Sequence, residues 1–134
     1  MPESTTDELL RLNQKLLESI VMGDWKVYES LCDASITCFE PEARGQVVAG
    51  MPFHKFYFDL AIDPKSAKSA KTVTMAQPHV RLLGSEGAVL SYVRLTQSLD
   101  AAGAPQTSRV EETRVWQKLS GQWKHVHFHR SLNA

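Results

Sequence analysis

Three consecutive segments in the second half of the chain alternate between apolar and polar residues with a period of two. They cover residues 88–99, 108–119 and 121–130, and short turn-like sequences separate them. Such alternation is typical of half-buried strands, and neighbouring segments of this kind usually pair antiparallel. The sequence therefore predicts a sheet with at least three long strands, against which the rest of the chain must pack.

Each of these predicted strands carries one arginine in phase with apolar and aromatic residues. Side chains two residues apart share a strand face, so all three arginines are expected on the core-facing side of the sheet. They are Arg94, Arg114 and Arg130. Burying an unpaired guanidinium is costly, which favours a wet or ligand-filled cavity with carboxylates as counter-charges. Plain salt bridges or a shifted register are the alternative explanations.

Composition argues against several functional classes. The 134 residues contain 15 basic and 15 acidic side chains, so no overall charge favours nucleic acid or an anionic membrane. No apolar run approaches the roughly 18 residues of a membrane span, and the acidic N-terminus is unlike a signal peptide. Cys32 and Cys38 form neither a metal-type cluster nor a disulfide scaffold, which indicates reduced thiols in the cytoplasm. We expect one domain over residues 1–134, without a cofactor.

The first part of the chain predicts helices. Thr5 and Glu8 have capping-box spacing, and leucines and isoleucines then recur every three or four residues up to Gly23, a good helix stop. A short helix is expected from Trp25 to about residue 32, and a third begins at residues 50–52, where proline is tolerated in the first turn. These helices should cover one face of the sheet.

Shorter strands and a loop complete the predicted fold. Thr37–Phe39 is interpreted as a brief strand, and residues 72–83 as one strand broken by a bend at Pro78. The lysine-, serine- and alanine-rich residues 63–71 predict a solvated loop. Helices followed by a curved antiparallel sheet make the expected class α+β, with helices on one face of the sheet.

Six motifs, in order along nearly the whole chain, resemble the association, or hub, domain of calcium/calmodulin-dependent protein kinase II. They are Phe39-Glu-Pro-Glu-Ala43, Gly50-Met-Pro-Phe-His-Lys-Phe-Tyr-Phe58, Pro78-His-Val80, Ser91-Tyr-Val-Arg-Leu-Thr-Gln97, Glu111-Glu-Thr-Arg-Val-Trp116 and Val126-His-Phe-His-Arg-Ser131. The resemblance implies the cone-shaped nuclear-transport-factor-2-like fold, with a long N-terminal helix and two short ones on a strongly bent sheet. It also implies assembly into stacked ring homo-oligomers, without catalysis by the domain itself.

The resemblance also implies an arginine-lined cavity that accepts small carboxylates. The family's cavity residues match Tyr28, His54, Arg94, Arg114 and Arg130, and Glu40 matches an acidic residue of the same region. The alternation had indicated the same three arginines independently. Because Glu40 and Glu112 can neutralise at most two of the three charges, an anion should be held there by bidentate guanidinium contacts. For His54, a hydrogen-bonded packing role is an equally good interpretation.

The chain differs from the kinases in having no room for a kinase domain or a calmodulin-binding segment. We therefore expect an excised hub or a free-standing one, which could enter mixed rings with hub domains of the kinase family. An enzyme of the same fold is the alternative function, with Glu40 or Glu112 as base and Tyr28 as hydrogen-bond donor. Three nearby arginines should lower the pKa of such a base and weaken it.

Strict alternation also predicts a polar and aromatic face on the last strand. Trp123, His125, His127 and His129 should share the side opposite the arginines, where we expect a subunit interface. Two of these histidines could instead bind zinc with a third ligand from a neighbouring strand. No acidic or cysteine partner is evident on that face, so no metal is expected.

Overall fold

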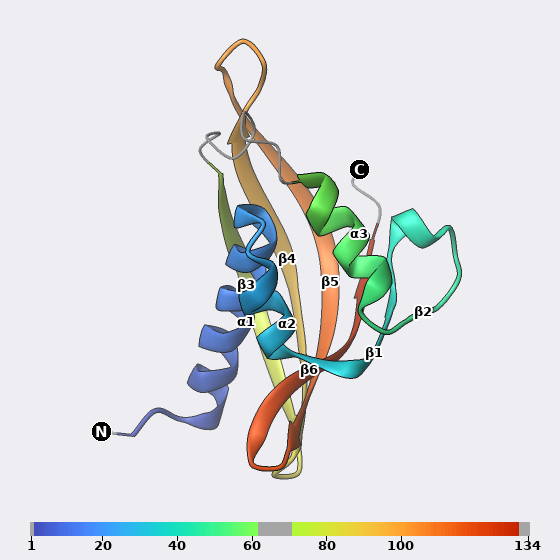
Figure 1. Cartoon of the computed structure of the whole chain (residues 1–134). Helices are drawn as coiled ribbons and strands as arrows, with labels where there is room; N and C mark the ends of the chain where they lie inside the picture. Colours follow the sequence, from blue (N-terminus) through green and yellow to red (C-terminus); the bar gives the residue numbers. More distant parts are fainter. Residues whose placement is uncertain (1, 62–70, 132–134) are drawn as a thin grey trace.

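The computed structural model describes residues 2–61 and 71–131, which form a curved sheet with helices on one side of it (Figure 1). The helices are α1 (Thr5–Met22), α2 (Trp25–Leu31) and α3 (Pro52–Ala61), with a 3-10 turn η1 (Pro41–Ala43). The strands are β1 (Cys32–Phe39), β2 (Val48–Ala49), β3 (Thr72–Leu83), β4 (Gly87–Leu99), β5 (Pro105–Leu119) and β6 (Gln122–Arg130). The α+β class predicted from the sequence is confirmed.

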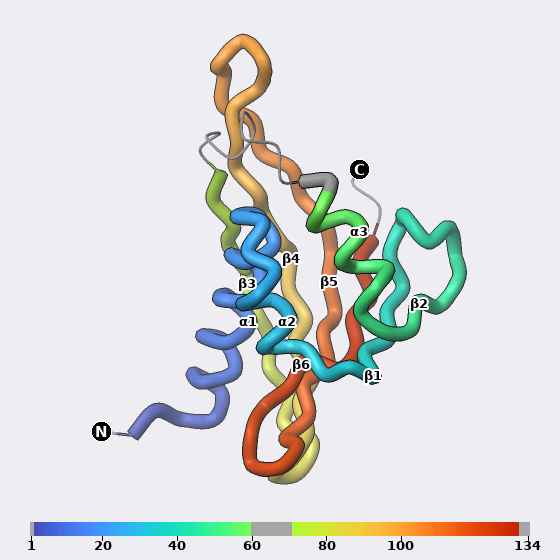
Figure 2. Tube along the Cα trace, viewed as in Figure 1, coloured from blue at the N-terminus to red at the C-terminus, as the bar shows by residue number. Residues whose placement is uncertain are grey.

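The strands lie in the order β2-β1-β6-β5-β4-β3. The three long alternating segments are β4, β5 and β6, and they pair antiparallel in sequence order, as predicted. The expectation of a wholly antiparallel sheet is wrong, because β1 pairs with β6 in parallel. Figure 2 shows how the early strand β1 returns to lie beside the end of the chain. This pairing brings residues near position 40 next to those near position 130.

Local signals define the ends of the first two helices. The side chain of Ser4 accepts a hydrogen bond from the Asp7 amide at 3.1 Å, so Ser4 is the N-cap of α1 and the predicted Thr5–Glu8 box is wrong. Gly23 ends α1 with φ of 67°, a left-handed conformation that glycine adopts without steric cost. Asp24 then caps α2 through the Val27 amide. The two caps place α2 directly against the end of α1.

The pairing register shifts at three places in the sheet, between β1 and β6, between β3 and β4, and between β5 and β6. In β3 the pairing with β4 shifts between Ala76 and His79, so the bend predicted at Pro78 is confirmed within one continuous strand. In β6 the partner of Trp116 is His125, whereas the partner of Val115 is His127. Val126 is thus an extra residue, and an extra residue reverses the faces on which the following side chains lie.

The bulge corrects the predicted interface face. Trp123 and His125 lie on the concave, helix-covered side and are buried, while His127 and His129 lie on the opposite side. The expectation that all four residues share one face is therefore wrong. The predicted loop 63–71 lies, apart from Lys71, outside the described residues. Among the helices that are described, none is long and apolar enough to cross a membrane.

Candidate functional site

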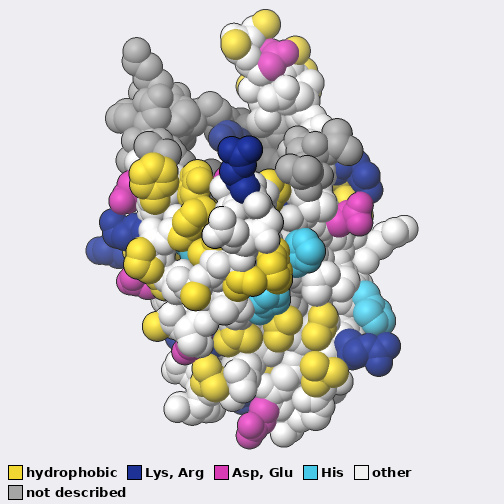
Figure 3. All heavy atoms as spheres, turned by 90° about the vertical axis from the view of Figure 1, so that its right-hand side faces the viewer, with side chains coloured by type: hydrophobic (Ala, Val, Ile, Leu, Met, Phe, Trp, Pro, Cys, Tyr) yellow, Lys and Arg dark blue, Asp and Glu magenta, His cyan; other side chains and the backbone are white. Residues whose placement is uncertain are grey.

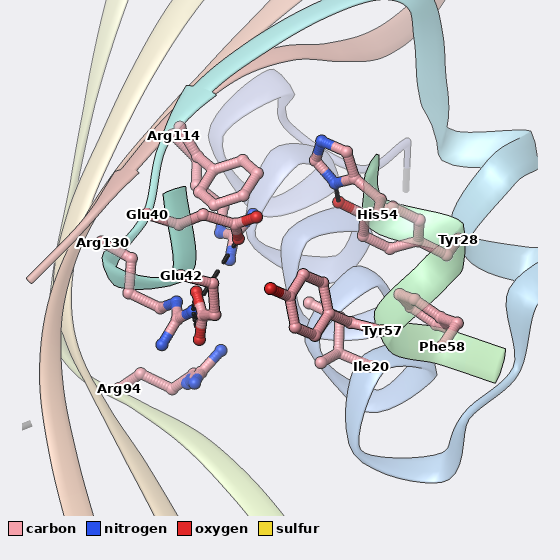
Figure 4. A pocket seen from close by; sticks show the side chains of 11 residues that line it. Ile20, Tyr28, Glu40, Glu42, His54, Tyr57, Phe58, Arg94, Arg114 and Arg130 are labelled. Carbon is pink, nitrogen blue, oxygen red and sulfur yellow. Dashed lines mark hydrogen bonds and ion pairs between the residues drawn. The ribbon is translucent and has the colours of Figure 1, made fainter. Parts of the chain in front are cut away.

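A pocket of about 220 Å³ lies between the concave face of the sheet and the segments α2, η1 and α3 (Figure 4). Three arginines reach it from the neighbouring strands β4, β5 and β6. Its lining consists of Ile20, Tyr28, Glu40, Glu42, His54, Tyr57, Phe58, Arg94, Arg114, Phe128 and Arg130. Guanidinium groups thus form one wall of the pocket, and aromatic side chains face them.

The deepest charged pair is Glu112 with Arg114, both on β5. Arg114 donates from Nε and Nη2 to the two carboxylate oxygens of Glu112, at 3.2 and 3.1 Å. Arg94 approaches the same carboxylate at 3.0 Å, and the Tyr92 hydroxyl donates to it at 2.6 Å. The side chains of Glu112 and Arg114 are only 0% and 1% exposed. Although burial would raise it, the two arginines hold the pKa of Glu112 below its ordinary value.

Arg114 is also occupied on its other side. Its Nη1 lies 3.3 Å from Nε2 of His125, and the guanidinium packs 4.4 Å from the centre of the Phe128 ring. A guanidinium only donates, so Nε2 of His125 must accept and its Nδ1 must carry the proton, facing Cys32 Sγ at 3.4 Å. Burial, followed by the charge of Arg114, lowers the pKa of His125 well below its ordinary value. His125 is therefore a neutral hydrogen-bond acceptor for Arg114.

The third arginine is paired by a carboxylate that the sequence analysis did not include. Nη2 of Arg130 contacts both oxygens of Glu42, one of them at 2.6 Å, and lies 3.8 Å from Glu40. The 3-10 turn η1 brings both glutamates to Arg130, because Glu40 is the residue before the turn and Glu42 lies within it. The pocket region thus contains three arginines and three carboxylates. The expected excess of positive charge is wrong for the fully ionised site.

The two glutamates near Arg130 differ in their acidity. Burial raises the pKa of Glu40, and repulsion from Glu42 adds to this, outweighing the effect of Arg130. The arginines do act to lower the pKa of Glu40, as expected, but the net shift is upward. Hydrogen bonding to Arg130 lowers the pKa of Glu42 in spite of its partial burial. Glu42 is thus the more acidic of the two carboxylates beside Arg130.

Arg94 and Arg130 are the two partly accessible cations of the pocket, with side chains 16% and 18% exposed. Nη1 of Arg94 is paired with Glu112, but its buried Nε has no hydrogen-bond partner among the described residues. A group that enters the pocket can therefore meet guanidinium donors from two strands. Arg114 also lines the pocket, but its side chain is almost fully buried and each of its three nitrogens already has a hydrogen-bond partner.

Tyr28 and His54 close the opposite wall (Figure 4). The Tyr28 hydroxyl lies 2.8 Å from Nδ1 of His54, whose Nε2 is 3.7 Å from Cys38 Sγ. Burial, with a smaller effect of Arg114, lowers the pKa of His54 from 6.5 to about 4. His54 is thus a neutral, hydrogen-bonded side chain that both packs in the core and faces the pocket.

Residues 5–134 match the family model of the calcium/calmodulin dependent protein kinase II association domain. The chain belongs to this family. The delta subunit of the kinase from Oryctolagus cuniculus is 47% identical over 124 residues, 92% of this chain but 23% of that relative. The chain therefore spans about a quarter of the length of the curated kinase, the part formed by the association domain.

Solved association domains have the same structure. The hub homology domain from Chlamydamonas reinhardtii is 51% identical, covers 96% of this chain and 98% of its own, and has a TM-score of 0.88. The association domain of C. elegans is 40% identical, with 95% of each chain covered and a TM-score of 0.84. A nuclear transport factor 2-like protein from Salmonella enterica, 20% identical with a TM-score of 0.66, shares the fold alone. The predicted nuclear-transport-factor-2-like fold is confirmed.

In this association domain the three histidines of β6 cannot bind one metal ion together. His125 points into the core, whereas His127 lies on the opposite face and hydrogen-bonds to Thr37 Oγ1 at 2.7 Å. Over residues 2–61 and 71–131, no group of three or more histidine, cysteine, aspartate or glutamate side chains could hold a metal ion. His127 and His129 remain on the face where an interface was expected.

Sequence analysis missed the residue that links α1 of the association domain to the pocket. Asn13 donates to the Tyr92 hydroxyl at 3.0 Å and accepts from the Trp116 indole at 3.0 Å. Tyr92 in turn holds Glu112, so the ion pair behind the pocket is braced from the first helix. The position of Asn13 could have indicated this role, because Asn13 follows Leu9 by four residues and so lies within the apolar stripe of the helix. A polar residue there must find buried hydrogen-bond partners.

Proposed function

We propose that this chain is an assembly domain that builds stacked ring homo-oligomers. The observation that carries the proposal is the family match over residues 5–134, together with solved hub domains of closely similar structure. Exposed apolar side chains support it, since Val47, Phe56 and Tyr57 are exposed near β2 and on α3. Figure 3 shows hydrophobic and histidine side chains intermingled on the side that carries these elements. We place the domain in the cytoplasm, which suits two buried, unbridged cysteines.

Native mass spectrometry of the purified chain is expected to show a closed assembly of many copies at micromolar concentration. Closed point-group symmetry buries matching surfaces on every copy, so one discrete mass or a narrow set of masses should dominate. We further propose that the chain enters mixed rings with kinase hub domains. Co-expression with such a hub should then give intermediate masses. Monomer alone would contradict the assembly role, and separate homo-oligomers would contradict mixing.

We also propose that the pocket binds a small carboxylate. The proposal rests on Arg94 and Arg130, whose guanidinium groups border the pocket opposite the aromatic walls. Planar guanidinium groups recognise carboxylates through paired hydrogen bonds, and the apolar walls suit a short hydrocarbon tail. Arg114 also lines the pocket, and its ion pair with the buried Glu112 holds the charged wall in place.

Calorimetric titration with acetate, propionate and butyrate is expected to show binding that the neutral amide butyramide lacks. Arg130→Gln should weaken butyrate binding by about 1.5 to 3 kcal/mol, because a charge-assisted hydrogen-bond donor is lost. Arg109→Gln is the matched control, since Arg109 is an exposed arginine of the same sheet outside the pocket. Equal heats of binding for the carboxylates and for butyramide would contradict the proposal. An equal loss of butyrate affinity in Arg130→Gln and Arg109→Gln would contradict it as well.

The alternative function, acid–base catalysis, is favoured by one observation. Glu40 borders the pocket with a raised pKa, as a general base requires. Glu112 does not qualify, because its carboxylate is bound by two arginines and a tyrosine. Turnover of an enolisable ketone that disappears in Glu40→Gln would establish this alternative. Assembly remains the better supported function, because the family match covers it directly.

A further inference from the structure

One side of the pocket already holds a carboxylate that the chain itself supplies. Glu42 places both oxygens on Nη2 of Arg130, the position in which a bound carboxylate would also be most stable. In Figure 4 the side chain of Glu42 lies between Arg130 and the aromatic wall of the pocket. Within this part of the site, the chain's own acid occupies the arginine that should receive a ligand.

The contact between Glu42 and Arg130 matters for anion binding because it completes the charge balance of the pocket. With three arginines and three glutamates around the pocket, an entering anion finds no unbalanced positive charge. It binds strongly only where an existing carboxylate withdraws. Glu112 cannot withdraw, because it is fully buried and is held by Arg94, Arg114 and Tyr92. Removing it would leave buried charges unpaired, which is costly.

Glu42 is the carboxylate that can leave. Its side chain is 34% exposed, and Arg130 is its hydrogen-bond partner. It stands on η1, a single 3-10 turn, and residues 44–47 that follow are exposed up to the two-residue strand β2. Short segments with exposed backbone and few packing contacts open at low free-energy cost. An outward rotation of Glu42 would free Arg130 without disturbing the core.

We propose that Glu42 is a tethered competitor, which occupies Arg130 in the resting site and must be displaced before a small carboxylate binds there. The inference rests on the proposed carboxylate-binding function and specifies how that site is regulated. Affinity for the ligand is then reduced by the fraction of time that Glu42 holds the arginine. Any event that draws η1 outward, including a contact with another subunit, would raise that affinity.

The test is Glu42→Gln, which keeps the size of the side chain and removes its charge. If Glu42 holds Arg130 about nine-tenths of the time, the variant should bind butyrate about tenfold more tightly than the wild type. Glu40→Gln is the matched control, because it removes an equal charge from a carboxylate that lies 3.8 Å from the same Nη2, farther away than Glu42. Its effect on affinity should be clearly smaller.

Calorimetry with butyrate on the full chain, in wild type and both variants, separates the outcomes. Tighter binding in Glu42→Gln alone supports the competitor. Unchanged or weaker binding in Glu42→Gln, with wild-type binding intact, overturns the competitor and leaves the carboxylate site standing. An equal gain in butyrate affinity in both variants would mean that the loss of any nearby negative charge raises the affinity. That result would also overturn the competitor. Absence of binding in all three proteins removes the carboxylate function and the competitor together.

Discussion

Replacing Arg114 with alanine is expected to lower the free energy of unfolding by about 3 to 5 kcal/mol. The substitution removes the partner that contacts both oxygens of Glu112, whose side chain is fully buried. It also removes the donor facing Nε2 of His125 and the cation packed on the Phe128 ring. Arg94 still approaches Glu112, but from one side only. Urea denaturation monitored by circular dichroism, at one fixed protein concentration, measures the loss.

Two further variants make this prediction specific. Arg109→Ala removes an exposed arginine from the same strand and should change stability by no more than about 0.5 kcal/mol. A double variant, Arg114→Met with Glu112→Gln, removes both buried charges and should recover part of the loss, because no unpaired carboxylate remains. If Arg114→Ala lowers the free energy of unfolding by less than about 1 kcal/mol, the ion pair of Arg114 with Glu112 is not a structural element of the core.

The sequence was sufficient for features that depend on period and on local signals. The alternation in β4 and β5 placed Arg94 and Arg114 on the concave face, because those strands pair in register along their whole length. Pro78 marked the bend in β3 correctly, since proline cannot donate to a ladder. These inferences needed no knowledge of what lies across the sheet.

The bulge in β6 could not be inferred in this way. Histidine alternates with apolar residues through His125, His127 and His129, so the sequence shows an unbroken period of two. The extra residue, Val126, is apparent only from the pairing with β5. The buried partners of His125, Arg114 and Cys32, lie on other strands and compensate for burying an imidazole. The burial of His125 depends on these tertiary contacts, and they cannot be inferred from the alternation within one strand.

Glu42 was missed for a related reason. The sequence shows two glutamates around Pro41, and only Glu40 was assigned to the pocket. Their approach to Arg130 depends on the parallel pairing of β1 with β6, in which Phe39 lies opposite His129. That pairing joins segments about 90 residues apart, as for Glu42 and Arg130. The spacing of the two glutamates could have indicated Glu42 as a second pocket residue. It could not have indicated that Arg130 is its partner.

Lowering the pH from 7 to 5 is expected to reduce the free energy of unfolding by about 3 to 4 kcal/mol on account of two buried histidines. The pKa of His54 falls from 6.5 to about 4 on folding, chiefly through burial. The pKa of His125 is lowered well below 6.5, again through burial and then through Arg114. Both imidazoles are therefore neutral in the folded protein across this range.

The direction follows from which state binds more protons. Above about pH 6.5 both histidines are neutral whether the chain is folded or unfolded, so their contribution does not change with pH. Below 6.5 the unfolded chain takes up two protons that the folded chain excludes, and stability falls by up to about 1.4 kcal/mol per pH unit for each histidine. The loss from His54 levels off near pH 4, whereas that from His125 continues lower. The raised pKa of Glu40 acts in the opposite direction, because the folded chain then binds the extra proton, and it reduces the net loss.

Urea denaturation at pH 7, 6 and 5 measures the effect, with protein concentration held constant because self-association would add to apparent stability. His125→Gln is the informative variant, since its amide oxygen can accept from Arg114 in place of Nε2 but cannot be protonated in this range. It should remove about half of the pH dependence, and His54→Gln should remove most of the rest. A wild-type pH dependence between pH 7 and 5 that neither His125→Gln nor His54→Gln changes would contradict the neutral state of the two histidines in the fold.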